Sequence, residues 1–592
     1  MAARYLILLS RLAERPDVKS RITRLTGMRS AFEGHHISVL TGSDCPLTAR
    51  RDDRGIVVGT IFDKATFRPL ESAALPADEP LGCIQSYLIE KCWGRYVSVA
   101  QDADGTVSVM RDPSGGLPAY HLHVGGDHAI ASDVETFVAA GLLRAEVDWD
   151  NIGFQFRFPN QRSPATALKG VRELLPGFGL VLDGSDIAEK PYWSPCDYIG
   201  SPSVNVTGDV GERLRRTVDG CIQALAIPKG RMLVGVSGGL DSSIIASALV
   251  RGHCQPDGVT VATDHPAGDE RGFAREMCAA VGLPLHEAKL SIDHVDLRRP
   301  SAPSIPRPIG EPFLQSFDRI VREIARDERI DSLFRGNGGD AVFCFMQNAS
   351  PIVDRLAAEG LHPAIWRTIR DVCKLTESSL GAVLRAALKR ACAGPRSSGD
   401  HRDNRFLASE AGFSSAYPGH PWLATRRAVP PGRAAHVQWV VRVQRFAEGY
   451  APSASLELIC PLQAQPIVEH CLGIPSWEWV AGGINRSAVR RAYADVLPAA
   501  TLKRTVKGGP EAFCIDLLVA YREVVREMLM DGLLAQNGIL DRGAVERCLS
   551  YVGPARDNDH LRLLALVDAE AWARHWSTGA GIFEGAGAIG AT

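Results

Sequence analysis

The sequence predicts a two-domain protein of mixed class, α+β in its first third and α/β in the remainder. Its 592 residues are too many for a single core. Short strand-like runs separated by turns fill residues 1–195, whereas strands and helices alternate over residues 208–577. We therefore expect an antiparallel β-sandwich in front, a doubly wound parallel sheet with helical additions behind it, and a disordered Gly/Ala tail over 578–592.

The front region owes its predicted strands to short apolar runs bounded by Asp-Asp-Arg-Gly, Asp-Ala-Asp-Gly and Asp-Pro-Ser-Gly turns. A few helical patterns, such as Ile84 to Lys91, interrupt them, and Pro195 to Thr207 is the expected linker. The predicted strands are Tyr5–Leu9, Gly55–Phe62, Arg95–Ala100, Thr106–Arg111, His128–Ser132 and Gly179–Leu182.

Composition excludes several classes of function. A net charge of −2 and a hydrophobic content of 45% are ordinary for a soluble protein and offer no basic surface for nucleic acid or an anionic membrane. Fourteen cysteines lack Cys-x-x-Cys spacing, so we expect reduced thiols rather than disulfides or a zinc site. Neither a signal peptide nor a membrane span is apparent, which predicts a cytoplasmic protein.

The stretch from Arg231 to Ser243 carries the clearest chemistry. A valine-rich strand breaks at Gly238 and Gly239 and then resumes as a helical pattern. At such a junction the unpaired N–H groups of the turn and the positive end of the helix dipole bind anions. The glycines let a phosphate approach the backbone, and Ser237 and Ser242 add hydroxyl groups on either side.

Asp241 lies inside this predicted phosphate cradle and implies a cation. A carboxylate there would repel phosphate oxygens unless Mg²⁺ bridges the two. A second loop, Gly336 to Asp340, repeats the order of strand end, glycines and aspartate, and Thr263 ends a buried strand between the two loops. Because ligands of parallel sheets lie at the carboxyl ends of the strands, we expect both loops to meet there.

Ser-Gly-Gly-Leu-Asp-Ser resembles the PP-loop of the ATP pyrophosphatases, and with the second loop it resembles the asparagine synthetase family. The resemblance implies that ATP is split between its α and β phosphates and that Asp241 and Asp340 are the Mg²⁺ ligands. It also implies a set of residues that contact ATP or pyrophosphate, namely Val236, Ser237, Gly238, Gly239, Asp241, Ser242, Thr263 and Gly336.

Two later segments extend the resemblance. Arg504 to Gly509 looks like the family's closing segment, in which Lys507 matches a lysine that stabilises charge on the α-phosphate. Leu456 to Leu462 resembles the Glu-x-Arg-x-Pro-Phe-Leu-Asp segment, with Glu457 at the glutamate, so Lys507 and Glu457 are the expected catalytic residues. Helical patterns otherwise cover Gln438 to Leu472, interrupted near Ala451-Pro452, and Ile515 to Trp576.

The front region resembles the glutaminase-type (Ntn) domain of asparagine synthetases, on the strength of Trp93-Gly-Arg-Tyr-Val97 and Arg111-Asp-Pro-Ser-Gly115. In that family the mature chain begins with a nucleophilic cysteine. This sequence begins Met1-Ala2-Ala3, and its first cysteine is Cys45. We therefore expect a degenerate glutamine-amidotransferase-like domain that hydrolyses no glutamine.

Within the family, the sequence looks most like the lasso peptide cyclases. Asn337 stands where β-lactam synthetases carry a catalytic tyrosine, and the chain has extra length between Phe345 and Gln438. The resemblance implies an AMP-forming ligase that adenylates an Asp or Glu side chain of a precursor peptide and joins it to the peptide's N-terminal amine. A leader-peptide protease and a leader-recognition protein are the expected partners, without nucleic acid or membrane. The alternatives are a small-molecule ligase of the asparagine- or β-lactam-synthetase type and a non-catalytic scaffold.

Overall fold

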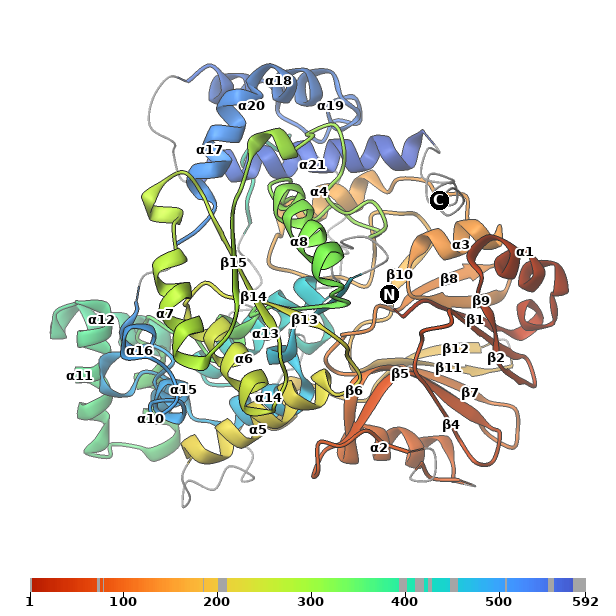
Figure 1. Ribbon diagram of the computed structural model, residues 1–592, viewed down its shortest axis with the longest axis horizontal. Helices are drawn as coiled ribbons and strands as arrows, with labels where there is room; N and C mark the ends of the chain where they lie inside the picture. The colour runs from red at the N-terminus through yellow and green to blue at the C-terminus, as the bar shows by residue number, and fades with distance from the viewer. Residues whose placement is uncertain are drawn as a thin grey trace.

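The protein is described from a computed structural model, shown in Figure 1. The structure describes residues 3–71, 75–77, 79–184, 186–200, 210–392, 402–409, 420–423, 429–447, 456–505, 508–551 and 558–578. Lys507, residues 201–207 of the predicted linker and residues 579–592 of the predicted tail lie outside these ranges.

The front of the chain folds into two six-stranded sheets in which every pairing is antiparallel, as predicted. The first sheet has the order β10 (Val171–Glu173), β8 (Tyr120–Val124), β9 (Asp127–Ala131), β1 (Tyr5–Leu9), β3 (Ile37–Thr41) and β2 (Arg29–Gly34). The second has the order β12 (Asp186–Pro191), β11 (Phe178–Asp183), β7 (Val107–Arg111), β6 (Cys92–Gln101), β5 (Gly55–Asp63) and β4 (Leu47–Ala49).

All five residues of β1 are buried, which explains their unbroken apolar run. The helices of this region are α1 (Pro16–Thr26), α2 (Leu81–Lys91), α3 (Val134–Ala140) and α4 (Trp149–Arg157).

A five-stranded parallel sheet forms the core of the second region. Its order is β15 (Leu285–Lys289), β14 (Asp257–Ala262), β13 (Met232–Gly235), β16 (Ser332–Phe334) and β17 (Glu457–Ile459). The chain runs outward from β13 to β15 and then returns to β16 on the other side of β13. The strand order therefore reverses between β13 and β16, and at such a switch point the following loops diverge and leave room for a ligand.

Helices cover both faces of this sheet. Val234 of β13 packs in one hydrophobic cluster with α6 (Leu240–Arg251) and α5 (Val210–Ala226). The adjacent Leu233 packs in a separate cluster with α8 (Leu314–Glu328). Because successive strand residues point to opposite faces, this division confirms the predicted doubly wound arrangement. The remaining connecting helix, α7 (Arg271–Val281), contacts α6 and β14.

The predicted helix over Gln438 to Leu472 is only partly correct. Helices α13 (Pro431–Ala447) and α14 (Gln465–Gly473) occupy its ends, but Glu457–Ile459 between them is the strand β17. The reason is tertiary, because this short run pairs in parallel with β16 and so completes the sheet.

Two groups of helices are added to this framework. The short α9 (Gly339–Val342) is followed by α10 (Ser350–Glu359), α11 (Ala364–Thr376) and α12 (Leu380–Cys392), which lie at the end of the molecule farthest from the front sheets (Figure 1). After α15 (Ser487–Ala492) and α16 (Ala499–Lys503), the chain ends in α17 (Glu511–Ala520), α18 (Arg522–Asp531), α19 (Leu533–Gln536), α20 (Arg542–Leu549) and α21 (Asp559–Ser577).

Both large hydrophobic clusters cross the boundary between the two regions. One joins Val58 of β5 to Val218 of α5, and the other joins Leu6 of β1 and Phe137 of α3 to Trp572 of α21. The front sheets are therefore packed on the second region over a broad apolar contact.

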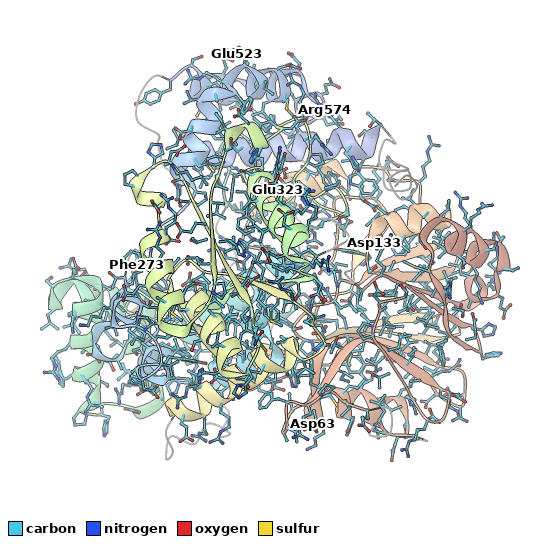
Figure 2. All side chains as sticks on the ribbon, in the orientation of Figure 1. Asp63, Asp133, Phe273, Glu323, Glu523 and Arg574 are labelled. Carbon is cyan, nitrogen blue, oxygen red and sulfur yellow. The ribbon has the colours of Figure 1, made fainter. Side chains whose placement is uncertain are left out.

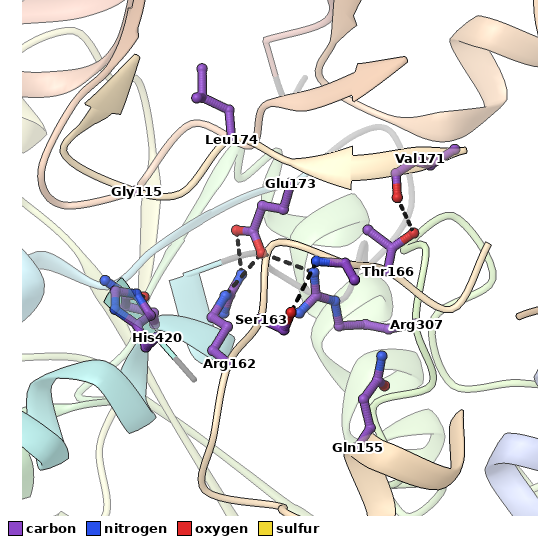
Figure 3. Close-up of polar contacts among 12 residues, drawn as sticks. Gly115, Gln155, Arg162, Ser163, Thr166, Val171, Glu173, Leu174, Arg307 and His420 are labelled. Carbon is purple, nitrogen blue, oxygen red and sulfur yellow. Dashed lines mark hydrogen bonds and ion pairs between the residues drawn. The ribbon is translucent and has the colours of Figure 1, made fainter. Parts of the chain in front are cut away.

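A buried carboxylate reinforces this junction (Figure 3). Glu173 of β10 is fully buried and accepts hydrogen bonds from Arg111 (2.8 Å) and Arg162 (2.5 Å), both in the front region. Arg307, from the loop before α8, donates to its other oxygen at 2.8 Å. Burial alone would raise the pKa of Glu173, but Arg162, Arg307 and Arg111 together hold that pKa well below its usual value.

Within the described ranges, no helix combines the length and the apolar character that crossing a membrane requires.

Candidate active site

The first predicted phosphate loop is a tight turn at the end of β13. Gly238 has φ of 65°, a conformation that favours glycine, and Gly239 is the residue preceding α6. A Cβ on Gly238 would lie 2.3 Å from Cβ of Phe273, so only glycine fits there. Phe273 projects from α7 beside this turn (Figure 2).

The two serine hydroxyls face each other across the turn. Oγ of Ser237 and Oγ of Ser242 are 3.3 Å apart, and the N–H of Gly239 donates to Ser237 Oγ at 3.3 Å. Val236 is buried and its N–H donates to Val259 of β14, so its role is to fix the start of the turn. The first N–H groups of α6 open into the same turn, which is the arrangement of an anion site.

The second loop, after β16, lies directly against the first. A Cβ on Gly339 would lie 2.4 Å from Cγ of Asp241, and a Cβ on Gly336 would lie 3.2 Å from Cβ of the same residue. Any side chain at Gly339 would separate the loops. The sheet thus brings Asp241 and the Gly336–Asp340 loop together at the switch point.

The structure also places an arginine between the two aspartates. Nη1 of Arg486 donates to Oδ1 of Asp241 at 3.0 Å and to Oδ1 of Asp340 at 2.5 Å. Arg486 is mostly buried, has φ of 52°, and lies over the ring of Phe345 at 5.2 Å. One cationic nitrogen therefore lies between both carboxylates and offsets one of their two negative charges.

This arrangement fits the predicted magnesium site. The donors are two carboxylate oxygens, the ligand type that Mg²⁺ prefers, and they converge within 3.0 Å of one positive nitrogen. The guanidinium stands in for the cation that two aspartates beside a phosphate cradle require.

The segments on either side of Lys507 are tied to the first loop. Arg504 donates to the carbonyl oxygen of Ser237 at 2.8 Å and to Glu270 at 2.5 Å, and its guanidinium lies 4.2 Å from the centre of the Phe273 ring. Gly508 N–H donates to the same oxygen of Glu270 at 2.9 Å. Lys507 itself is outside the described residues, but both of its flanks are anchored beside the phosphate turn.

Arg490 holds this closing segment together from α15. It donates to the carbonyl oxygens of Leu502 (2.5 Å) and Arg504 (3.0 Å) and to Asn485. Burial and the neighbouring Arg486 lower the pKa of Arg490 to about 10.

Thr263 lies at the same carboxyl edge, directly after β14. Its side chain is buried, and its hydroxyl donates to the carbonyl oxygen of His265 at 3.2 Å. It is thus one strand away from the first loop, with its hydroxyl engaged locally.

Glu457 is not brought to the phosphate loops. It is the first residue of β17, in register with Ser332, so it lies at the amino ends of the strands. It forms ion pairs with Arg95 of β6 and with Lys229, which precedes β13. Burial would raise the pKa of Glu457, but Arg95 and Lys229 outweigh it and leave that pKa lowered. This placement gives Glu457 a role in joining the two regions and does not support the expected role as a proton acceptor.

Asn337 lies in the second loop with its carbonyl oxygen accepting a hydrogen bond from Gln463 at 3.2 Å. Gln463 also packs under Gly338, where a Cβ would lie 2.9 Å from its Nε2. Gln463 directly follows the Leu456 to Leu462 segment, and here it supports the glycine loop.

The front region shows no reactive thiol at Cys45 or Cys92. Both side chains are buried, and burial raises the pKa of each thiol to about 12. Neither is a thiolate at neutral pH.

Sequence reasoning missed three residues of this site, Arg486, Arg504 and Glu270. Arg504 lies in the segment that resembles the family's closing segment, so its register was available as a signal, whereas Arg486 lies before that segment. Glu270 carries no local pattern, because its partner Arg504 is 234 residues away.

A glycine turn at a sheet switch point, with two aspartates converging beside it, is the arrangement expected of an α/β enzyme that binds a nucleotide. Comparison with protein families identifies which one. The asparagine synthase family matches residues 210–574, more than half of the chain, and the glutamine amidotransferase domain matches residues 84–193. The chain belongs to the asparagine synthase family and is an ATP-dependent carbon–nitrogen ligase.

Two solved structures are similar to the chain. Glutamine phosphoribosylpyrophosphate amidotransferase from B. subtilis, complexed with ADP and GMP, has 13% identity over 56% of this chain and 90% of its own, with a TM-score of 0.21. The allosteric regulatory enzyme of purine biosynthesis has 11% identity over 73% of this chain and 99% of its own, also with a TM-score of 0.21. No curated protein sequence matches the chain.

Proposed function

We propose that the protein is a macrolactam-forming peptide cyclase of the lasso peptide type. An Asp or Glu side chain of a precursor peptide attacks the α-phosphorus of ATP, and pyrophosphate leaves. The peptide's N-terminal amine then attacks the acyl carbon, the amine loses a proton, and AMP leaves as the isopeptide bond forms. A leader-peptide protease and a leader-recognition protein would supply the trimmed substrate.

Each part of the site has a role in this scheme. The turn from Ser237 to Ser242 would hold the β and γ phosphates through backbone N–H groups and two hydroxyls. Mg²⁺ bound by Asp241 and Asp340 would neutralise phosphate charge. Arg486 borders the same carboxylates, and Lys507 would face the α-phosphate, where charge develops as pyrophosphate departs.

The choice of a peptide substrate rests on the surroundings of the second loop and of Glu457. Asn337 offers an amide that accepts no proton at neutral pH, and Glu457 is engaged with Arg95 and Lys229 at the other end of the strands. A nucleophile used here must arrive largely deprotonated. A peptide α-amine, with a pKa near about 8, meets that requirement better than ammonia or a side-chain amine.

A small-molecule ligase of the asparagine- or β-lactam-synthetase type is the alternative, and the matched amidotransferase domain favours it. The buried, protonated thiols of Cys45 and Cys92 weigh against glutamine as the nitrogen source. A non-catalytic scaffold is a poorer alternative, because both phosphate loops and both aspartates are in place.

The test uses the full chain with ATP, Mg²⁺ and a short peptide encoded beside its own reading frame. We expect a product lighter than the peptide by one water, together with AMP and pyrophosphate. The same peptide with an acetylated N-terminus should still support pyrophosphate release but yield no ring. Formation of asparagine from aspartate and ammonia, without any change in the peptide, would replace this proposal with the small-molecule alternative.

A further inference from the structure

The helices α10 to α12 expose an unusual amount of apolar surface. Six of the twelve exposed large hydrophobic side chains among the described residues lie on or between these three helices. The most exposed are Leu361 (94%), Leu388 (65%) and Trp366 (60%). The others are Leu356, Leu380 and Leu384. Clusters of this kind on a soluble protein mark a surface that is covered by a partner.

Leucines form a continuous row along α12. Leu380, Leu384 and Leu388 are spaced by four residues and so lie on one face of the helix. The buried residues Val383 and Ala387 form a neighbouring stripe, which is the one that packs on the rest of the protein. The apolar face of α12 is thus wider than its packing within the chain uses.

The helix α11 runs beside α12 and also exposes a large apolar side chain, Trp366. The two helices contact each other and are joined by only three residues, which makes them an antiparallel pair. Trp366 in the first turn of α11 therefore lies at the same end as Leu388 in the last turn of α12. We name the leucine row Leu380, Leu384 and Leu388 the α12 face.

Positive charge borders the α12 face. On α12, Arg385 and Lys389 follow the leucines around the helix, and the helix has no acidic residue. Arg367 and Arg370 of the neighbouring α11 are also exposed, and Glu377, between the two helices, is an exposed acidic residue near one end of the row. A second copy of this chain would therefore meet like charges, whereas an acidic partner would be attracted.

We propose that the α12 face binds an acidic amphipathic helix of a partner protein. A single row of leucines one helix long matches the apolar stripe of another helix, and glutamates or aspartates flanking that stripe would reach Arg385 and Lys389. Arginine and tryptophan, both prominent here, are also the side chains most enriched in protein interfaces.

The position of this face relative to the catalytic segment gives the interaction a consequence. Nζ of Lys374, on α11, donates to the carbonyl oxygen of Gly482 at 3.0 Å, and Gly483 packs against the same side chain. These glycines precede Arg486 by only a few residues. A partner on the α12 face would therefore be held beside the segment that leads into the active site.

The test measures binding of two fluorescein-labelled helical peptides to the full chain by fluorescence anisotropy. Both peptides carry the same leucine stripe, flanked in one by glutamates and in the other by lysines. We expect the glutamate peptide to bind more tightly. Leu384→Glu combined with Leu388→Glu should weaken that binding about tenfold or more, because these leucines would lie at the centre of the contact. Leu47→Glu, at an exposed leucine of β4 far from this face, is the matched control and should bind like the unmodified chain.

A charge exchange tests the chemistry of the partner without touching the leucines. Arg385→Glu combined with Lys389→Glu should shift preference from the glutamate peptide to the lysine peptide. Unchanged affinity in the leucine variant, or equal binding of both peptides, overturns the proposal. So does leucine-dependent binding to vesicles of phosphatidylglycerol in place of the peptide, which would identify a membrane surface, or leucine-dependent dimerisation of the chain.

Discussion

At Arg486, one guanidinium lies between the two aspartates that the sequence predicts as ligands of a metal ion. Arg486 draws Asp241 and Asp340 together, although the two aspartates lie 245 and 146 residues before it in the sequence. The two aspartates could be predicted because each sits in a local pattern of strand, glycine and carboxylate. Arg486 could not, because nothing near it in the sequence specifies a contact that only the folded sheet creates. The same reason explains why Glu457 was expected in the site, since a motif fixes its neighbours in sequence but not the end of the strand on which it lies.

The first prediction at the residue scale concerns the aspartates. We expect Asp241→Asn or Asp340→Asn to lower pyrophosphate release by roughly 10²-fold or more, because each removes one charge that would hold Mg²⁺ on the phosphates. Thermal unfolding should change little. Asp264→Asn, on an exposed loop after β14 and paired with Lys289, is the control and should keep full activity. Full activity of both site variants would remove the assignment.

The second residue-scale prediction concerns Lys507 and the charge that develops on the α-phosphate. With Lys507→Ala we expect kcat to fall by roughly 10²-fold with a modest change in KM, because the lysine acts on charge that develops in the transition state.

The rate of ring closure plotted against pH should follow the ionisation of the peptide's own N-terminal amine. This is checked with a second peptide whose N-terminal residue shifts that amine pKa. A profile that stays fixed with the second peptide but moves in Glu457→Gln would show that the enzyme supplies the base.

At the scale of elements, burial and strand pairing explain which strands could be predicted from the sequence. The predicted strand Tyr5–Leu9 is β1 itself, because a strand buried on both sides is a continuous apolar run. β12 was missed because all of its residues are exposed, and β2 because its pairing with β3 shifts register between Ser30 and Phe32. β17 was read as helix because three residues carry no period of their own.

The element-scale prediction concerns the closing segment between α16 and α17. Glu270, at the start of α7, holds both Arg504 and the N–H of Gly508, so it fixes the segment on each side of residue 507. Glu270→Gln should lower kcat about tenfold while leaving stability nearly unchanged, since the charge-assisted bond to Arg504 weakens. Steady-state kinetics of pyrophosphate release, with Glu287→Gln on the exposed pair with Arg275 as control, would check this. Equal kcat in both variants would contradict the role.

At the scale of the whole molecule, the ion pair of Glu173 with Arg307 helps to link the front region to the ligase, and Arg111 and Arg162 of the front region share the same buried carboxylate. Removing the charge of Glu173 would leave the guanidinium groups of Arg111, Arg162 and Arg307 in a dry junction. We expect Glu173→Gln to destabilise the protein by about 3–5 kcal/mol. Glu146→Gln, on an exposed pair with Lys169, should cost under about 1 kcal/mol. Urea unfolding followed by circular dichroism measures both, and equal losses would contradict the assignment.

The same carboxylate predicts a pH dependence. Its pKa in the folded protein lies below the ordinary value of 4.5, so the unfolded chain binds its proton first as the pH falls. The stabilisation from Glu173 should be complete above that ordinary pKa and decline progressively below it. The unfolding free energy of the Glu173→Gln variant should lack this component, so the two proteins should converge in stability as the solution is acidified.

The hydrophobic clusters that run from β5 into α5 and from β1 into α21 mean that the segments matched by the family models are not the segments that fold independently. Two family models match separate stretches of the chain, yet each of the two large hydrophobic clusters contains residues from both stretches. Removing the front region would therefore expose apolar side chains of the ligase region that these clusters bury. We therefore expect heating to unfold both regions in a single cooperative transition.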